Sequence, residues 1–245
     1  MKKLLAVLLA GTMALSLAAC GGGKTTAGTA TKAAADTTAA GTENAAAEGK
    51  EDAGTELTGR LKAIKEAGVL KVATSPDYPP YEFEDITKDG QDKYVGADME
   101  LAKYIADKLG VKLQIEAMAF DACMAAIGQG RVDLTICGMV PKEERKTTMD
   151  FSDVYYNDGD QVIVIMKDSA DQYKSLADFA GQSIAAQNGT LQYDLVTTQI
   201  PDAKCEVVSA VTDGIMMLKT GKVAGIALAS VAADNYLANY PDLVE

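Results

Sequence analysis

The stretch Asp133–Ser152, DLTICGMVPKEERKTTMDFS, is the most informative part of this chain. Its apolar residues from Leu134 to Met139 predict a buried strand, and Gly138 and Pro141 mark the turn that ends it. Arg145 follows in a polar, helix-compatible segment. A strand that opens into a turn leaves backbone N–H groups pointing outward, and a guanidinium beside them offers a planar fork of donors. The stretch predicts a site that holds a carboxylate or another small oxyanion, with no nucleophile or base in it.

The first twenty residues have the pattern of a bacterial lipoprotein signal. Lys2 and Lys3 precede an apolar stretch, Leu4–Leu17, and small residues come immediately before Cys20. This stretch is too short and too early for a spanning helix, and a cysteine after the predicted cut is the residue that becomes lipidated. We expect residues 1–20 to be a signal peptide, with Cys20 anchoring the protein to the extracytoplasmic face of the cell membrane. A plain signal peptide with an accidental cysteine is the alternative.

Residues 21–56 differ in composition from everything that follows. They are rich in Ala, Thr, Gly, Glu and Lys and contain no aromatic residue. Such a segment cannot bury enough apolar surface to offset its ordering entropy, so we expect a disordered tether. Residues 57–245 are numerous enough for one or two compact units with real cores.

Composition excludes several classes of function. The net charge of −12 and the pI near 4.5 argue against a nucleic-acid partner, since no basic stripe is present to neutralise phosphates. The sequence contains no histidine, which removes the usual general base and every His-ligated metal site. We expect no metal and no cofactor. The spacing of Cys123, Cys137 and Cys205 matches no metal-binding motif, so we expect these residues to be buried and to pack as small apolar side chains. A disulfide between two of them is an alternative outside the cell.

Hydrophobic periodicity predicts alternating strands and helices. Strands are expected at 69–74, 111–118, 134–139, 161–166, 183–186, 205–208 and 223–229. Helices are expected at 98–109, 120–128, 176–179, 191–199, 213–218 and 231–237. This alternation predicts two α/β units with mainly parallel sheets. Ligands in open α/β sheets bind beyond the carboxyl ends of the strands, where Ser75, Gly138 and Ala229 lie.

Four short motifs carry a resemblance to a known family. They are GADMEL at 96–101, ATSPDYPPYEF at 73–83, GMVPKEER at 138–145 and FSD at 151–153. Through these four motifs, taken in their order and spacing along the sequence, the chain resembles the family 3 solute-binding proteins of bacterial ABC transporters, which bind polar amino acids. The resemblance implies a two-lobed, type II periplasmic-binding-protein-like α/β fold, with lobe 1 at 57–160 and lobe 2 at 161–245. It also implies a C-terminal return of lobe 1, which we expect to be missing because the chain ends at Glu245.

The resemblance also assigns binding roles to individual residues. It implies that Arg145 pairs with the ligand's α-carboxylate and that Tyr78 packs against the ligand, with Ser75 as a polar contact. Backbone groups of Gly138 and Val140 match strand-end contacts. In lobe 2 the start of a helix, at Gly189, Thr190 and Leu191, would offer free N–H groups to a carboxylate. The alternatives are a surface ion pair of Arg145 with Glu143 or Asp150, ordinary packing for Tyr78, and a simple helix start in lobe 2.

Three positions depart from the family pattern. Val140 replaces a hydroxyl-bearing residue, Ala97 a large residue, and Ala229 an aspartate that usually receives the ligand's ammonium group. Burying an ammonium without an anionic partner costs several kcal/mol, which amounts to orders of magnitude in affinity. Either another carboxylate, such as Asp77 or Glu82, takes over, or the ligand lacks a free α-ammonium. We favour the second alternative, an organic acid or an atypical amino acid derivative, with amino acids as the default class.

Together these features predict a function in import. We expect a monomeric, extracytoplasmic substrate-binding lipoprotein of an ABC importer, which captures a small carboxylate-bearing solute by cleft closure and delivers it to a membrane permease. We expect it not to be an enzyme. The alternatives are an enzyme on the same fold, similar to cyclohexadienyl dehydratase, and a receptor-linked sensing module.

Overall fold

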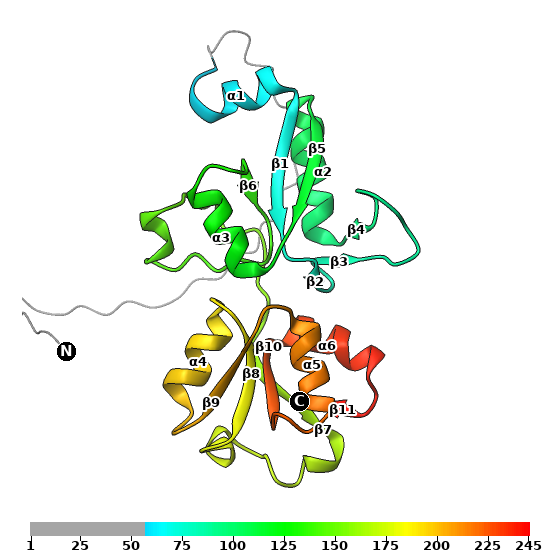
Figure 1. Ribbon diagram of the computed structural model, residues 1–245, viewed down its shortest axis with the longest axis vertical. Helices are drawn as coiled ribbons and strands as arrows, with labels where there is room; N and C mark the ends of the chain where they lie inside the picture. The colour runs from blue at the N-terminus through cyan, green and yellow to red at the C-terminus, as the bar shows by residue number, and fades with distance from the viewer. Residues whose placement is uncertain (1–56) are drawn as a thin grey trace, which may run out of the picture. The chain divides into compact units, whose positions relative to one another are not determined.

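Strand β1 (Val69–Thr74) is the centre of the first sheet in the computed structural model, which describes residues 57–245 (Figure 1). The predicted signal peptide, its lipidation site Cys20 and the predicted tether at 21–56 lie outside the described residues. The boundary at residue 160 stays a prediction, and lobe 1 and lobe 2 denote the two ranges on either side of it.

Lobe 1 is built on a parallel sheet of three strands in the order β5-β1-β6. Its elements are α1 (Gly59–Ala67), α2 (Ala97–Leu109), β5 (Lys112–Ala117), α3 (Phe120–Gly128), β6 (Leu134–Thr135) and the 3₁₀ helix η1 (Arg145–Thr147). Alternate residues of β1 face opposite helices: Leu70 and Val72 pack with α1 and α2, whereas Ala73 packs with α3. The sheet is therefore covered on both faces, as a parallel sheet requires.

A small antiparallel sheet follows β1 and brings two site residues together. It consists of β2 (Asp77–Tyr78), β3 (Glu82–Glu84) and β4 (Tyr94–Val95). Tyr78 pairs with Glu82 in the register of β2 and β3. Gly96, directly after β4, has φ 119°, and a side chain there would collide with the carbonyl oxygen of Tyr81. This position requires glycine because two backbone segments meet at it.

Lobe 2 is built on five strands in the order β11-β7-β10-β8-β9. Its elements are β7 (Gln161–Met166), η2 (Lys167–Ser169), η3 (Leu176–Phe179), β8 (Ser183–Gln187), α4 (Leu191–Gln199), β9 (Lys204–Val208), α5 (Val211–Lys219), β10 (Gly225–Ala229), α6 (Ser230–Asn239) and β11 (Leu243–Val244). Strand β8 runs parallel to β9 and β10, whereas β7 runs antiparallel to β10 and β11.

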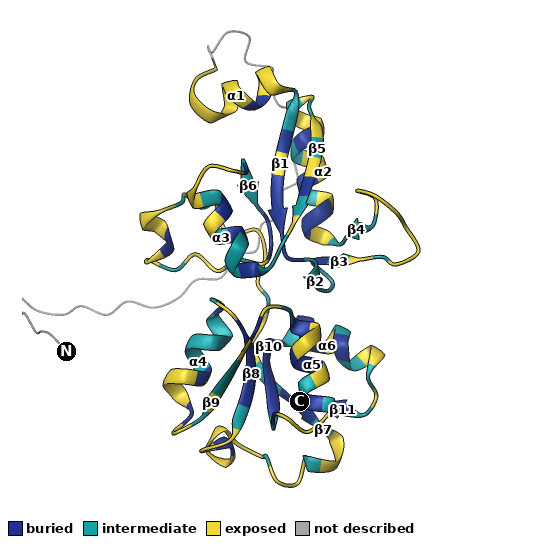
Figure 2. Ribbon diagram, viewed as in Figure 1, coloured by how far each residue is buried: buried dark blue, intermediate teal, exposed yellow. Residues whose placement is uncertain are grey.

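The core of lobe 2 follows the two-residue period of its central strands. Ile226 and Leu228 of β10 pack with α5 and α6, whereas Ala227 between them packs with α4. Every residue of β10 is buried, and Figure 2 shows β10 as buried along its length while the outer faces of the helices are exposed. This burial gives the end of β10, which reaches the candidate site, a rigid support.

The structure confirms the mixed α/β architecture and corrects three details of the sequence prediction. The strand expected at 134–139 ends at Thr135, because Gly138 has φ 59° and its N–H donates to Asp98 Oδ2 (3.0 Å). The sheet of lobe 2 is mixed and not mainly parallel. Helix α1 was not expected from the sequence. Cys123 and Cys137 are buried and all three cysteines in residues 57–245 are free, so no disulfide forms among them.

Neither a bilayer-crossing helix nor a cluster of metal ligands occurs among the described residues. Within residues 57–245, no helix combines the length and apolar character that crossing a bilayer requires. In the same range, no group of three or more Cys, Asp or Glu side chains is arranged to hold a metal ion.

Candidate ligand-binding site

A pocket lies where the strand ends of both lobes meet. Its empty volume is about 640 Å³, which includes space that is open to solvent. Seven of the eight residues with predicted binding roles line it: Ser75, Tyr78, Gly138, Val140, Arg145, Thr190 and Leu191. Gly189, the eighth, does not line the pocket. That these residues touch a ligand stays a prediction.

Arg145 lies in η1 and is buried, with 6% of its surface exposed. Its guanidinium donates to the carbonyl oxygens of Val140 (2.6 Å) and Gly189 (2.6 Å) and stands 5.6 Å from the ring centre of Phe120. Burial lowers the pKa of Arg145 from its ordinary value, although the group stays charged. Two of its five donors are used by these carbonyls, so donors remain for an anion in the pocket. The alternative of a surface ion pair with Glu143 or Asp150 is wrong, because Arg145 is buried and forms no such pair.

The predicted helix start in lobe 2 is present at α4. Thr190 is its N-cap, and the Thr190 hydroxyl accepts a hydrogen bond from the Tyr193 N–H (3.3 Å). The N–H groups of Leu191 and Gln192 lie in the first turn, where helices lack internal acceptors. Both residues line the pocket. Lys142 of lobe 1 contacts the same helix through the Thr190 carbonyl and an ion pair with Asp194.

The strand-end residues of lobe 1 differ in how free their backbone groups are. The Gly138 N–H is already used by Asp98, so it does not point freely into the pocket. The Val140 N–H donates no hydrogen bond within residues 57–245, and Val140 is 42% exposed. A Cβ added at Gly138 would lie 3.8 Å from the ring of Tyr78, and both residues line the pocket. Of these two backbone positions, only Val140 offers a free donor.

Asp77 joins the two lobes. Its carboxylate accepts hydrogen bonds from Ser75 Oγ (3.0 Å), Gln187 Nε2 (3.2 Å) and the Val211 N–H (2.6 Å), and its carbonyl accepts from the Tyr236 hydroxyl (2.6 Å). Burial raises the pKa of Asp77, and these hydrogen bonds oppose that rise. Three donors within the protein already occupy most of the acceptor sites of this carboxylate, which leaves Asp77 little capacity for a cation.

Glu82 is the most deeply buried acid of the pocket, with 1% of its surface exposed. Its Oε2 atom has no hydrogen-bond partner among the described residues. Burial, followed by the nearby Cys137 and Asp98, raises its pKa well above the ordinary 4.5. A buried acceptor without a donor is rare in folded proteins and suggests that something absent from the chain itself completes the site.

Asp158 is an acid of this pocket that the sequence prediction did not include. It precedes β7, and its two oxygens accept hydrogen bonds from the hydroxyls of Tyr81 (2.7 Å) and Tyr78 (3.3 Å). The Tyr78 hydroxyl in turn accepts from the Ala229 N–H (3.2 Å). Burial raises the pKa of Asp158, whereas the two tyrosine hydrogen bonds lower it. Burial and the negative charge of Asp158 also raise the pKa of Tyr78.

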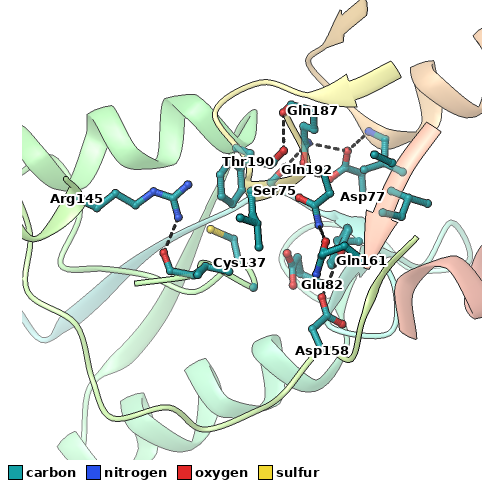
Figure 3. A pocket seen from close by; sticks show the side chains of 18 residues that line it. Ser75, Asp77, Glu82, Cys137, Arg145, Asp158, Gln161, Gln187, Thr190 and Gln192 are labelled. Atoms are coloured by element: carbon teal, nitrogen blue, oxygen red, sulfur yellow. Dashed lines mark hydrogen bonds between the residues drawn. The ribbon is translucent and has the colours of Figure 1, made fainter. Parts of the chain in front are cut away.

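The charges of the pocket are unevenly distributed. Arg145 is the only basic residue among the described residues that line it, and it faces the three acids Asp77, Glu82 and Asp158. Figure 3 shows Arg145 on one side of the pocket and Glu82 and Asp158 on the other. This arrangement suits a ligand that carries both a carboxylate and positive charge.

Comparison with known proteins assigns the family. Residues 70–230 match the model of the bacterial extracellular solute-binding proteins, family 3, and the chain belongs to this family. Extracellular solute-binding proteins of this kind serve ABC importers outside the cytoplasm.

Similar proteins carry names that refer to amino acids. The arginine-binding extracellular protein ArtP of Bacillus subtilis is 34% identical over 197 residues, which cover 80% of this chain and 71% of ArtP. The L-cystine-binding protein TcyA of the same species is 32% identical over 71% of this chain and 62% of TcyA. Among solved structures, the arginine-bound form of a truncated ArgBP from T. maritima matches with a TM-score of 0.69 and 38% identity, covering 75% of this chain and 84% of that chain. These neighbours confirm the two-lobed fold class.

A shorter match concerns the enzyme alternative. The cyclohexadienyl dehydratase of Pseudomonas aeruginosa is 33% identical over 111 residues, which cover 45% of this chain and 40% of the enzyme. The longer and more similar matches are solute-binding proteins.

Proposed function

We propose that this protein is the substrate-binding component of an ABC importer and that its ligand is an α-amino acid with a cationic side chain. The observation that carries the proposal is the distribution of charge in the pocket, with one guanidinium opposite three acids. Relatives named for arginine support the same class of ligand. L-Arginine is the first candidate.

The charges of such a ligand match those of the pocket one by one. Its α-carboxylate pairs with Arg145, as the resemblance implied, and with the first turn of α4. Its two positive groups pair with Glu82 and Asp158, because Asp77 is already satisfied by three donors within the protein. The side-chain cation then completes the unpartnered Glu82 Oε2.

Binding is coupled to closure of the two lobes in this proposal. Arg145 and Lys142 of lobe 1 reach the Gly189 carbonyl and Asp194 of lobe 2, and Asp77 accepts from the Val211 N–H. Contacts of this kind form only when the lobes are together. A ligand that adds further contacts to both lobes shifts the population toward the closed form, which the permease then recognises.

Calorimetry on the purified chain tests the ligand class. L-Arginine, L-citrulline, L-glutamine and L-cystine are titrated in turn, because L-citrulline has nearly the shape of L-arginine but a neutral side chain. We expect L-arginine to bind at least about tenfold more tightly than L-citrulline, equivalent to about 1.4 kcal/mol. Equal affinity for the two, or tight binding of L-cystine alone, would contradict a cationic ligand.

The enzyme alternative is tested on the same protein. A binding protein leaves its ligand unchanged, so incubation with prephenate or arogenate should yield no new product. Turnover of either compound would overturn the assignment as a binding component.

We also propose that a lipid on Cys20 anchors the protein to the extracytoplasmic face of the cell membrane. The support is the sequence pattern before that residue, a short apolar stretch after two lysines. A Cys20→Ser variant should be lost from the membrane fraction. The control variant Cys205→Ser, changed at a distant residue, should stay in it. Retention of Cys20→Ser with membranes would contradict the anchor.

A further inference from the structure

The carboxyl end of β10 carries no charge of its own, although it reaches the pocket. Ala229, the last residue of β10, is 1% exposed, and its N–H donates to the Tyr78 hydroxyl (3.2 Å). The same hydroxyl lies 3.3 Å from Asp158 Oδ2. Ala229 and Asp158 therefore share one tyrosine hydroxyl, and a carboxylate stands beside this strand end although the strand does not supply it.

The register of the lobe 2 sheet explains how Asp158 comes to this place. Ala229 of β10 is the antiparallel partner of Gln161, the first residue of β7. The Ser230 N–H donates to the Asp160 carbonyl (2.8 Å), which continues the pairing beyond the strands. Gly159 has φ 76°, and a side chain there would meet Ser230 Oγ at 2.3 Å. Asp158 precedes β7, the neighbour of β10, and this close turn places it beside the end of β10.

Asp158 has unused capacity for a cation. Tyr81 and Tyr78 each donate one hydrogen bond to it, and an ionised carboxylate accepts about four. Both donors are neutral, and Asp158 forms no ion pair with a lysine or arginine in residues 57–245. It lines the pocket and is half-buried, so a cation placed there meets a partly desolvated, fixed carboxylate.

The other two acids of the pocket are less suited to this role. Asp77 already accepts three hydrogen bonds, one of them from a backbone N–H of lobe 2. Glu82 is 1% exposed and lies next to Asp98, in the interior of lobe 1. Asp158 alone adjoins the end of β10.

We propose that Asp158 receives the α-ammonium group of the ligand and is the residue that requires an α-amino acid. The inference rests on the proposed function and makes it more specific. It departs from the alternative favoured from the sequence, a ligand without a free α-ammonium, and adopts the other one, with a carboxylate that is neither Asp77 nor Glu82. Tyr78 and Tyr81 act as positioning residues, since their hydroxyls hold the carboxylate in place.

The test combines a variant with a matched pair of ligands. Asp158→Asn removes the charge and keeps the shape, and Asp158→Ser is measured in parallel so that one misfolded variant does not decide the result. Asp160→Asn, an exposed acid two residues away, is the control. Calorimetry compares L-arginine with 5-guanidinopentanoate, which lacks only the α-ammonium group, and L-glutamine with glutaramate, which differs in the same way.

The expected result is a loss that depends on the ammonium group. Asp158→Asn should weaken L-arginine by about 30-fold or more and change 5-guanidinopentanoate by less than about threefold, while Asp160→Asn changes neither. An equal loss for both members of a pair would overturn the role of Asp158 and leave the proposed function standing. If the unaltered protein binds L-glutamine but not L-arginine, the proposed cationic ligand fails, and the glutamine pair still tests Asp158. If it binds neither, the role of Asp158 fails as well.

Discussion

Replacing Glu82 by glutamine should make the ligand-free protein more stable and the binding site weaker. The Glu82 side chain is 1% exposed and its Oε2 has no partner among the described residues. A buried polar group without a partner costs about 1–3 kcal/mol. Above the folded-state pKa the carboxylate must be buried as a charge, which the neutral amide of Glu82→Gln avoids, so the free energy of unfolding should rise there by about 1–3 kcal/mol. For a folded part of this size that corresponds to an increase in Tm of about 2–12 °C.

The stabilisation by Glu82→Gln should depend on pH with a defined sign. The folded-state pKa of Glu82 lies well above its ordinary 4.5, so the folded state retains a proton that the unfolded state has lost. Its contribution to stability is complete below about pH 4.5 and is lost as the pH rises through the folded-state pKa. The Tm difference between Glu82→Gln and the unaltered protein should therefore be small near pH 4.5 and grow toward pH 7.5.

Thermal unfolding and calorimetry together test this reasoning. L-Arginine should bind Glu82→Gln at least about tenfold more weakly, because a buried charge pair is lost, while L-citrulline changes little. Glu84→Gln, an exposed residue of the same strand that pairs with Lys93, is the control and should alter neither property by much. A lower Tm at pH 7.5 combined with an unchanged affinity for L-arginine would refute the role given to Glu82.

Three further substitutions give distinct outcomes. Arg145→Lys keeps the charge but loses the fork that donates to Val140 and Gly189, so every carboxylate-bearing ligand should bind about 30-fold more weakly in calorimetry, and an unchanged affinity would contradict the role of Arg145. Asp77→Ala removes the acceptor for the Val211 N–H and should weaken all ligands to a similar degree, since it acts on lobe contact; a loss confined to cationic ligands would contradict this. Gly96→Ala should lower the free energy of unfolding in urea by at least about 2 kcal/mol, because a Cβ would lie 2.2 Å from the Tyr81 carbonyl oxygen. Its control Gly110→Ala has no atom within 4 Å of the added Cβ and should lose less; equal losses would contradict the steric argument.

Hydrophobic periodicity was sufficient to predict most of the folded elements. The strand at 69–74, the helix at 120–128 and the strand at 161–166 have the predicted bounds, because each alternates or repeats clearly between turn residues. Helix α1 was missed because only Ile64 among its residues is buried, so its pattern is weak. The direction of β7 could not be deduced either, since alternation of side chains is the same in parallel and antiparallel strands.

The candidate site was predictable only in part, for a different reason. Arg145 and Tyr78 belong to motifs that the family resemblance identifies, and both line the pocket. Asp158 lies in the polar segment Asn157–Asp160, which has no periodicity and belongs to no motif. Its position depends on the register between β7 and β10 and on the turn at Gly159, both of which are properties of the folded chain. A polar residue next to a strand end was the only signal available.

A crystal structure of the protein with L-arginine tests the central claim most directly. We predict the ligand's α-carboxylate within hydrogen-bond distance of the Arg145 guanidinium, its α-ammonium group against Asp158, and its guanidinium against Glu82. A ligand bound in the reverse orientation, with its carboxylate away from Arg145, would contradict the account, as would a pocket left empty at saturating L-arginine.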